Sequence, residues 1–388
     1  MDLYHPLRAL REGSWFKLIC GASFQHLPAI RNLVLAYTLA GADCVDVAAD
    51  PAVIVAARDA LNVAANWRDA ALSKGFDACA APWLMVSLND GEDPHFRKAV
   101  LDPAECPSGC PRPCEAICPA QAIRFDPSHS GVIETSCYGC GRCLPICPVQ
   151  HISTRSYVST PASIAPLVLS GVDAVEIHTQ VGRLEDFKRL WTAIRPFASN
   201  LKLIAISCPD GDDLIGYLWA LYDTICPLPC PLIWQTDGRP MSGDIGIGTT
   251  RAAVKLGQKV LAAGLPGYVQ LAGGTNSHTV SKLRSLGLLR QREASSRHVA
   301  GIAYGSYART LLTPVLEQLE QMGEQVLERE AQRSRTDDEL RLMPHPALHL
   351  EEVPDLLWQA VHLADSLVSQ LKRPMKLKQT IPKLGAIG

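Results

Sequence analysis

The run CYGCGRCLPICPVQHI, residues 137–152, contains four cysteines, the last of which is followed by proline. Its spacing, Cys137-x2-Cys140-x2-Cys143-x3-Cys147-Pro148, is that of the bacterial ferredoxin type, in which three thiolates hold one cluster and the fourth reaches a second cluster. An earlier stretch, Cys114-x3-Cys118-Pro119 followed by Ala-Gln-Ala-Ile, repeats the end of this run. Two related copies predict a ferredoxin-like module with two iron–sulfur clusters.

Crossed ligation divides the eight cysteines of the two copies into two sets. Cluster 2 would be held by Cys118, Cys137, Cys140 and Cys143. Cluster 1 would be held by Cys106, Cys110, Cys114 and Cys147. The first copy departs from the ferredoxin pattern, which would place its first two cysteines at positions 108 and 111, and prolines stiffen its wider loop. We expect two [4Fe-4S] clusters, with a three-iron or labile cluster 1 as the alternative.

A four-cysteine zinc site and plain buried thiols are the competing interpretations of these cysteines. Zinc sites usually show two separated Cys-x2-Cys pairs, whereas here four cysteines fall within residues 137–147 and end in Cys-Pro. The spacing therefore favours iron and sulfide.

Apolar residues recur at matching positions of the two copies. Ile117 and Ile146, and Ile123 and Ile152, are predicted to pack across the pseudo-twofold axis that relates the copies. Between the copies, residues 122–125 and 131–134 are predicted to form a strand pair around an Asp-Pro-Ser turn.

Length and composition describe an ordinary folded protein. The chain has 388 residues, 47% of them hydrophobic and 20% charged, which suffices for one large domain with a small insert. A net charge of −2 gives no bulk attraction to nucleic acid or to a membrane. No apolar run is long enough to span a bilayer, and the first residues do not have the pattern of a secretion signal. We therefore expect a cytoplasmic protein.

Outside the cysteine segment, short β-rich runs alternate with apolar patterns at helical spacing. The expected helices include 27–39, 53–65, 184–197, 214–225, 252–263 and 280–289. The expected strands are 16–20, 44–48, 83–87, 174–178, 201–207, 231–235, 268–271 and 299–303. Eight strands, most followed by a helix, predict a (β/α)8 barrel with the module inserted after the third strand. An open doubly wound α/β sheet is the alternative.

The chain is accordingly divided into three parts. Residues 1–92 and 161–310 are predicted to form the barrel, 93–160 the ferredoxin-like module, and 311–388 a helical extension. In the extension, helices are expected over 315–333 and 356–371, with a polar linker at 334–339. Such helices more often pack on their own domain than dock a partner.

Two glycine-rich loops follow the seventh and eighth predicted strands, where barrels often hold phosphate. Backbone N–H groups at Gly273, Gly274, Thr275, Gly305 and Ser306 could approach an anion such as the phosphate of FMN. The plain alternative is that glycine-rich turns close any strand-to-helix connection.

The remaining candidates have structural interpretations. Asp237 and Arg239 are expected to pair and hold their loop, and His178 is expected to be an interior histidine. The glycines of 243–248 match a dinucleotide loop only loosely. No catalytic set is predicted. Buried apolar thiols are expected at Cys20, Cys208, Cys226 and Cys230.

The cysteine segment, the loop WQTDGRPMSGD at 234–244 and the tail helices together resemble the cyanobacterial light-dependent period family. The resemblance implies an iron–sulfur protein that passes the cellular redox state, and so light intensity, to the circadian clock. It implies clock input kinases, core clock proteins and a photosynthetic redox pool or carrier as partners. The basic tail, residues 372–378, reads as a solvated terminus, with contact at a thylakoid surface as the alternative.

Three functions are consistent with these features. The first is a non-catalytic redox sensor or electron-transfer protein. The second is a flavin-linked barrel oxidoreductase fed by the clusters, which rests on the two glycine-rich loops. The third is a ferredoxin-like subunit of a larger electron-transfer complex.

Overall fold

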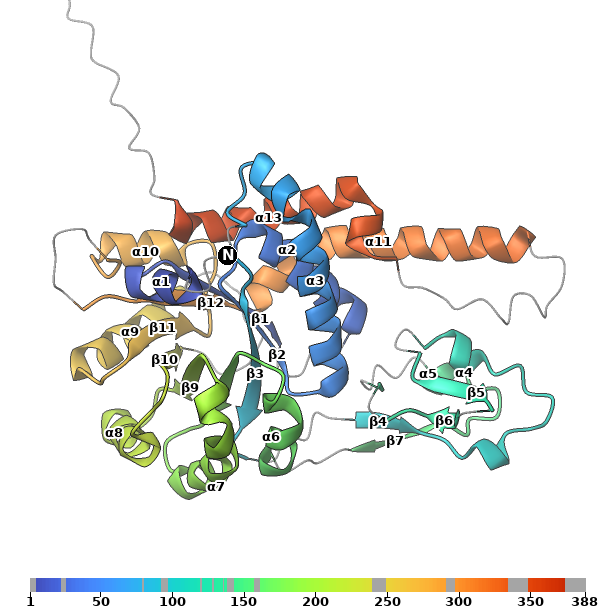
Figure 1. The fold of residues 1–388 in the computed structure, drawn as a ribbon, viewed down its shortest axis with the longest axis horizontal. Helices are drawn as coiled ribbons and strands as arrows, with labels where there is room; N and C mark the ends of the chain where they lie inside the picture. The colour runs from blue at the N-terminus through green and yellow to red at the C-terminus, as the bar shows by residue number, and fades with distance from the viewer. Residues whose placement is uncertain are drawn as a thin grey trace, which may run out of the picture.

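The computed structural model describes residues 5–21, 26–78, 80–91, 97–118, 121–127, 129–134, 136–137, 143–156, 161–238, 249–290, 297–333 and 348–373. Its centre is a closed barrel of eight parallel strands in the order β1-β12-β11-β10-β9-β8-β3-β2 (Figure 1). These strands are β1 Trp15–Gly21, β2 Cys44–Ala48, β3 Trp83–Asn89, β8 Ala174–His178, β9 Leu203–Pro209, β10 Leu232–Asp237, β11 Tyr268–Ala272 and β12 Gly301–Tyr304. All eight predicted strands are confirmed, and closure rules out the open sheet.

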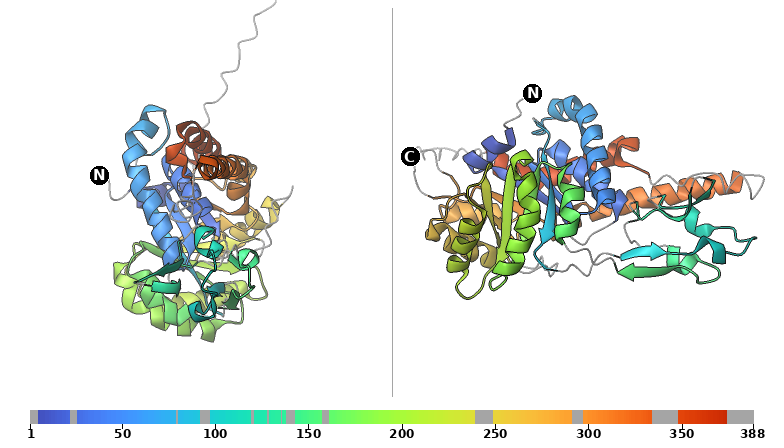
Figure 2. Two further views of the ribbon diagram at one scale, coloured as in Figure 1. Left: turned by 90° about the vertical axis from the view of Figure 1, so that its right-hand side faces the viewer. Right: turned by 60° about the horizontal axis from the view of Figure 1, so that its bottom comes forward.

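Helices cover the outside of the barrel (Figure 2). They are α2 Leu27–Ala40, α3 Pro51–Ser73, α6 Pro161–Leu169, α7 Leu184–Ile194, α8 Leu214–Ile225, α9 Thr250–Ala263, α10 Thr279–Ser285, α11 Ser306–Arg333 and α13 Pro354–Lys372. The outward residues of the strands and the inward residues of these helices form one apolar core. Among the described helices, none combines the length and apolar character that a membrane span needs.

Local signals explain where α2 ends and where α3 begins. Asp50 caps α3, because its Oδ1 accepts a hydrogen bond from the Ala52 N–H at 2.8 Å. Gly41 ends α2 in the left-handed region, with φ of 100°, and a Cβ there would lie 2.4 Å from the Asp77 carbonyl oxygen. Only glycine fits this turn.

The interior of the barrel is layered along its axis. The first residues of the strands, including Trp15, Cys44, Trp83 and Leu203, form a separate apolar cluster. Leu10 of helix α1 (His5–Glu12) packs into this cluster and closes the N-terminal end of the barrel. Polar side chains begin one layer above.

The C-terminal helices belong to the barrel core. α13 packs on α2 and α11, and its apolar stripe, from Leu356 to Val368, is buried there. α11 begins at Ser306, so residue 311, predicted as the start of the extension, lies within a helix. The predicted linker at 334–339 lies outside the described residues. These helices pack on their own domain.

The cysteine segment is inserted between β3 and β8, which pair directly in the barrel. It extends from one side of the barrel on an antiparallel ribbon of β4 (Arg97–Val100) and β7 (Ser153–Ser156) (Figures 1 and 2). Within it, β5 (Ile123–Asp126) pairs with β6 (His129–Val132), which confirms the predicted strand pair.

Candidate iron–sulfur site

Two short helices present the third cysteine of each copy. α4 (Pro113–Ala116) contains Cys114 and α5 (Cys143–Ile146) contains Cys143, and both thiols are buried. After each helix the chain reverses through a glutamine with positive φ, 48° at Gln121 and 51° at Gln150. The repeat seen in the sequence is therefore a repeat in backbone geometry.

Backbone N–H groups point at the cysteine sulfurs in the same way in both copies. Ala122 donates to Cys118 Sγ at 3.2 Å, and His151 donates to Cys147 Sγ at 3.4 Å, four residues downstream in each case. In the ribbon, the Ala99 N–H donates to Cys137 Sγ at 3.4 Å. Amide donors of this kind stabilise thiolates and the cluster charge that they share.

Cys147 shows the effect on protonation. Burial alone would raise its pKa, but hydrogen bonds from the backbone N–H groups of residues 149–152 outweigh burial and lower the pKa of the Cys147 thiol. A lowered pKa favours the thiolate, the form that binds iron. The donor arrangement therefore fits an iron–sulfur ligand.

The thiols predicted for cluster 1 influence one another electrostatically. Burial raises the pKa of Cys106, and the nearby Cys110 and Cys147 raise it further. Burial also raises the pKa of Cys114 to about 11, against the effect of backbone N–H groups, and Cys106 and Cys110 add to the rise. Four thiols that repel one another as thiolates gain most from a shared cationic iron centre.

The thiols predicted for cluster 2 lie in a small apolar core. Cys137 and Cys143 are buried there, 8% and 7% exposed, and Cys118 packs against the same core. Cys140 lies outside the described residues. All cysteines of the module that the structure describes are free thiols. Both ligand sets stay predictions that this geometry supports.

Within the described residues, no group of three or more His, Cys, Asp or Glu side chains is arranged around a single metal ion. The ligands of a cubane bind different iron atoms, so they are held apart by the breadth of the cluster.

The predicted packing of the repeated isoleucines is half right. Ile123 and Ile152 are buried in the module core. Ile117 and Ile146 are 39% and 42% exposed, so the prediction that they pack across the axis is wrong. Each ends or follows a one-turn helix whose buried face is already taken by a cysteine, and the isoleucine lies on the outer side.

The glycine-rich loops meet at the C-terminal ends of β11 and β12. The Thr275 hydroxyl donates to the Ala303 carbonyl at 2.6 Å, and the Thr249 hydroxyl donates to the Gly274 carbonyl at 2.9 Å. On the second loop, Arg309 donates to the Ser306 hydroxyl at 3.1 Å. These contacts give Gly274, Thr275 and Ser306 a structural role. An anion or FMN phosphate site at Gly273, Gly274, Thr275, Gly305 and Ser306 stays a prediction.

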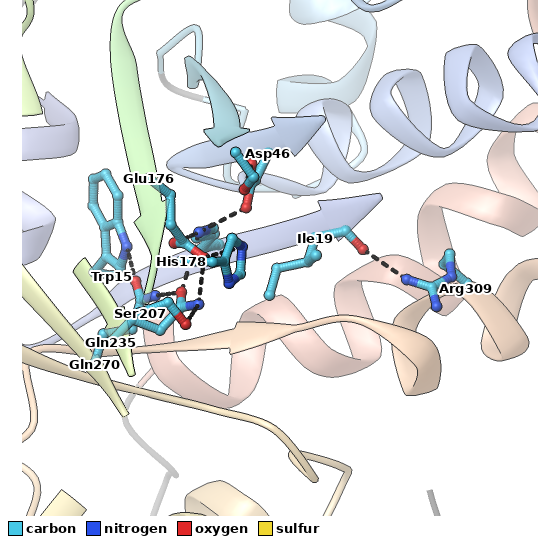
Figure 3. A network of polar contacts seen from close by, with 11 residues as sticks. Trp15, Ile19, Asp46, Glu176, His178, Ser207, Gln235, Gln270 and Arg309 are labelled. Atoms are coloured by element: carbon cyan, nitrogen blue, oxygen red, sulfur yellow. Dashed lines mark hydrogen bonds and ion pairs between the residues drawn. The ribbon is translucent and has the colours of Figure 1, made fainter. Parts of the chain in front are cut away.

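A buried charged network that the sequence reasoning missed fills the middle of the barrel (Figure 3). Lys17 Nζ on β1 contacts Asp46 Oδ2 at 2.8 Å, Gln235 Oε1 at 3.1 Å and the carboxylate of Glu176. Gln235 Nε2 donates to the other Glu176 oxygen, Oε1, at 2.6 Å. Lys17 and Glu176 are completely buried.

The network extends toward both ends of the barrel. Toward the N-terminal end of the barrel, Trp15 Nε1 donates to Gln270 Oε1 at 2.6 Å, and Gln270 donates to Gln235. Toward the C-terminal end of the barrel strands, the mouth of the barrel, His178 Nε2 lies 3.1 Å from Glu176 Oε1. His178 is therefore partnered, as predicted, but its side chain is 23% exposed and only partly interior.

The other predicted structural residues have mixed outcomes. Burial raises the pKa of Asp237 to about 6, against the attraction of His178. Arg239 and the loop 243–248 lie outside the described residues, so the predicted Asp237–Arg239 pair stays a prediction. Cys20 and Cys208 are buried, whereas Cys226 and Cys230 are only partly buried against the core.

Comparison with known proteins matches both parts of the chain to one family. Residues 106–158 match the LdpA Fe-S cluster-binding domain, and residues 167–370 match the Light dependent period A C-terminal domain. The chain is 50% identical over 374 residues to "Light dependent period A" of Synechococcus elongatus, covering 96% of this chain and 95% of that protein. Among solved structures, (S)-3-O-geranylgeranylglyceryl phosphate synthase from Thermoplasma acidophilum aligns at 13% identity and a TM-score of 0.29, covering 80% of this chain and 92% of that one.

Fold and cysteine geometry define an α/β-barrel protein with an inserted iron–sulfur cluster-binding segment. With half of all positions identical along nearly the full length of both chains, the protein belongs to the Light dependent period A family.

Proposed function

We propose that this protein is an iron–sulfur redox sensor that relays the redox state of the cell, and so light intensity, to the circadian clock. The observation that carries the proposal is the paired arrangement of thiols and backbone donors, with Ala122 on Cys118 and His151 on Cys147. Membership of a family named for a light-dependent period supports the link to the clock.

Two [4Fe-4S] clusters are the proposed cofactors, held by Cys106, Cys110, Cys114 and Cys147 and by Cys118, Cys137, Cys140 and Cys143. When bound, such clusters accept and release single electrons. The protein supplies N–H donors to the sulfurs and an apolar shell around Cys137 and Cys143, and both adjust how readily the added charge is accommodated.

A photosynthetic redox pool or carrier is the proposed electron source. Clock input kinases and clock proteins are the proposed signalling partners. The partly buried Cys106, Cys110 and Cys147 support electron entry at cluster 1. Cluster 2, with its buried thiols, would then be the inner cluster. We propose action in the cytoplasm, with contact at the thylakoid surface as the variant to test.

The test is an anaerobic purification followed by iron and sulfide analysis and a potentiometric titration monitored by EPR and visible absorption. We expect two clusters that titrate reversibly and no flavin. Cys143→Ser should remove the cluster 2 signal, whereas Cys230→Ser, outside the module, should leave both signals unchanged. Protein that binds zinc and no iron would overturn the proposal.

The same titration distinguishes the second function. A flavin semiquinone titrating beside the clusters would assign the protein to the flavin-linked oxidoreductases and direct attention to Gly274 and Ser306. Stable co-purification with a dehydrogenase core would instead support a subunit of a larger electron-transfer complex.

A further inference from the structure

One side chain of the ribbon bridges the cluster segment and the barrel. Lys98 Nζ on β4 donates to the backbone carbonyl of Glu134 at 2.5 Å. The same ammonium lies 3.5 Å from Asp50 Oδ2 at the mouth of the barrel. The bridge is shielded, because the side chains of Lys98 and Asp50 are only 12% and 4% exposed.

The neighbouring residue contacts a cluster ligand. Ala99 donates its N–H to Cys137 Sγ at 3.4 Å, and its side chain lies in the module core. Side chains alternate along a strand, so Lys98 points to the opposite face of the ribbon from Ala99. Ala99 thus contacts the thiol of Cys137, a proposed ligand of cluster 2. Lys98 contacts both the backbone at Glu134, which leads to Cys137, and Asp50 of the barrel.

At the barrel end, the bridge meets the start of a helix. Asp50 lies two residues beyond the end of β2 and caps the 23-residue helix α3 by accepting a hydrogen bond from Ala52 N–H. Its backbone carbonyl also accepts the Ile54 N–H at 3.0 Å. Val55, which directly follows the first turn of α3, is 65% exposed. A change at Asp50 therefore reaches an exposed apolar surface.

We propose that Lys98 couples the oxidation state of cluster 2 to the first turn of α3, which makes it a positioning residue for the sensor. The inference rests on the proposed function, because it requires a cluster that changes charge. One added electron makes the thiolates and sulfides more negative, which strengthens the Ala99 N–H contact and attracts the Lys98 ammonium.

An ammonium drawn toward the cluster leaves Asp50. A shielded carboxylate that loses its cation is poorly accommodated, so the cap loosens and the first turn of α3 opens more often. Reduction of cluster 2 is thereby reported at Val55, on the outer surface of the barrel.

The experiment compares hydrogen–deuterium exchange of full-length, cluster-loaded protein in the oxidised and the dithionite-reduced states. We expect reduction to speed exchange in the peptide that spans residues 51–56 by about threefold or more, as local opening of a helix end becomes more frequent. Peptides from α8, on the far side of the barrel, should exchange equally in both states.

Three variants distinguish redox coupling from a purely structural role of the Lys98–Asp50 contact. Asp50→Asn keeps an N-cap acceptor but removes the ion pair, so α3 should form normally and lose its response to reduction. Lys98→Met should also abolish the response and lower the midpoint potential of cluster 2, because a nearby positive charge favours the reduced state. Lys98→Arg should restore both.

The ribbon supplies a matched control. Arg155 on β7 is the register partner of Lys98, and its exposed side chain pairs with the exposed side chain of Glu134 at 2.9 Å. Arg155→Met should preserve the response of α3. If the clusters titrate and exchange over residues 51–56 is the same in both states, the coupling is wrong and the redox function stands. If no cluster titrates, the proposed function itself is wrong.

Discussion

Replacing Lys17 by methionine probes the charged layer inside the barrel. Methionine roughly fills the volume of the lysine stem but removes an ammonium that contacts Asp46, Glu176 and Gln235. The two carboxylates would remain buried at 2% and 0% exposure without their cation. Removing one partner of a buried pair costs about 3–5 kcal/mol, mainly because the opposite charge is left uncompensated.

The loss should be visible as a lower melting temperature. In domains of 150–250 residues, a change of 1 kcal/mol shifts the midpoint by about 2–4 °C, so the variant should melt about 10 °C below the wild type near neutral pH. The assay is far-UV circular dichroism during heating, with cluster content matched between samples. A surface control, Lys188→Met, removes an exposed pair with Glu185 and should shift the midpoint little.

The loss of stability in Lys17→Met should depend on pH in a predictable direction. Burial raises the pKa of Asp46 in the folded protein, and Lys17 holds that rise in check. Without Lys17 the folded pKa rises further above the unfolded value, so the penalty is full above the folded pKa and vanishes below the unfolded one. The variant should therefore approach the wild type in stability as pH falls from 8 toward 5.

A second substitution completes the test. Glu176→Gln added to Lys17→Met removes one of the two stranded carboxylates and should recover part of the stability at pH 8. If Lys17→Met melts within about 2 °C of the wild type at pH 8, the three side chains do not form the buried charged layer inferred from their contacts.

Three further predictions concern separate parts of the barrel. Lys372→Met breaks the buried contact with Asp43, at 2.5 Å, and should cost about 3 kcal/mol in thermal or urea unfolding. Gly274→Ala places a Cβ 2.9 Å from a backbone oxygen at positive φ and should cost about 2–4 kcal/mol, whereas Gly75→Ala, with open space around it, should cost about 1 kcal/mol. Asp237, whose pKa burial raises to about 6, disfavours folding once ionised, so stability is lost as pH rises from about 4 through 6. Asp237→Asn should flatten this pH dependence in melting curves.

The barrel could be predicted because parallel strands covered on both faces have continuous apolar sequences. Runs such as 83–87 and 201–207 stood out against the helical patterns between them, and the structure confirms a strand at each. The predicted start of the first C-terminal helix differs from the observed one. α11 begins at Ser306, several residues before its charged stripe, because its first turns pack on the barrel rather than face solvent.

The charged layer could not be predicted from sequence. Lys17 and Glu176 lie 159 residues apart, and each stands alone in an otherwise apolar run. Only closure of the barrel brings Lys17 and Glu176 together, and no local sequence pattern encodes their contact.

In the module, thiol spacing indicated the candidate ligands directly, since neighbouring ligands there are close in sequence. The exposure of Ile117 and Ile146 depends on which side of a one-turn helix faces the core, and four residues give too short a pattern to decide it.

The position of the insert has a consequence for how the chain folds. β3 and β8 are neighbours in the barrel, yet about 80 residues separate Asn89 from Ala174. The entropy cost of closing a loop grows as the logarithm of its length. If the ribbon of β4 and β7 forms first, the loop that remains free has about 25 residues, and closure becomes easier by about 1 kcal/mol, roughly a sixfold gain in rate. We therefore expect chains in which this ribbon pairs early to close their barrels faster than chains in which it does not.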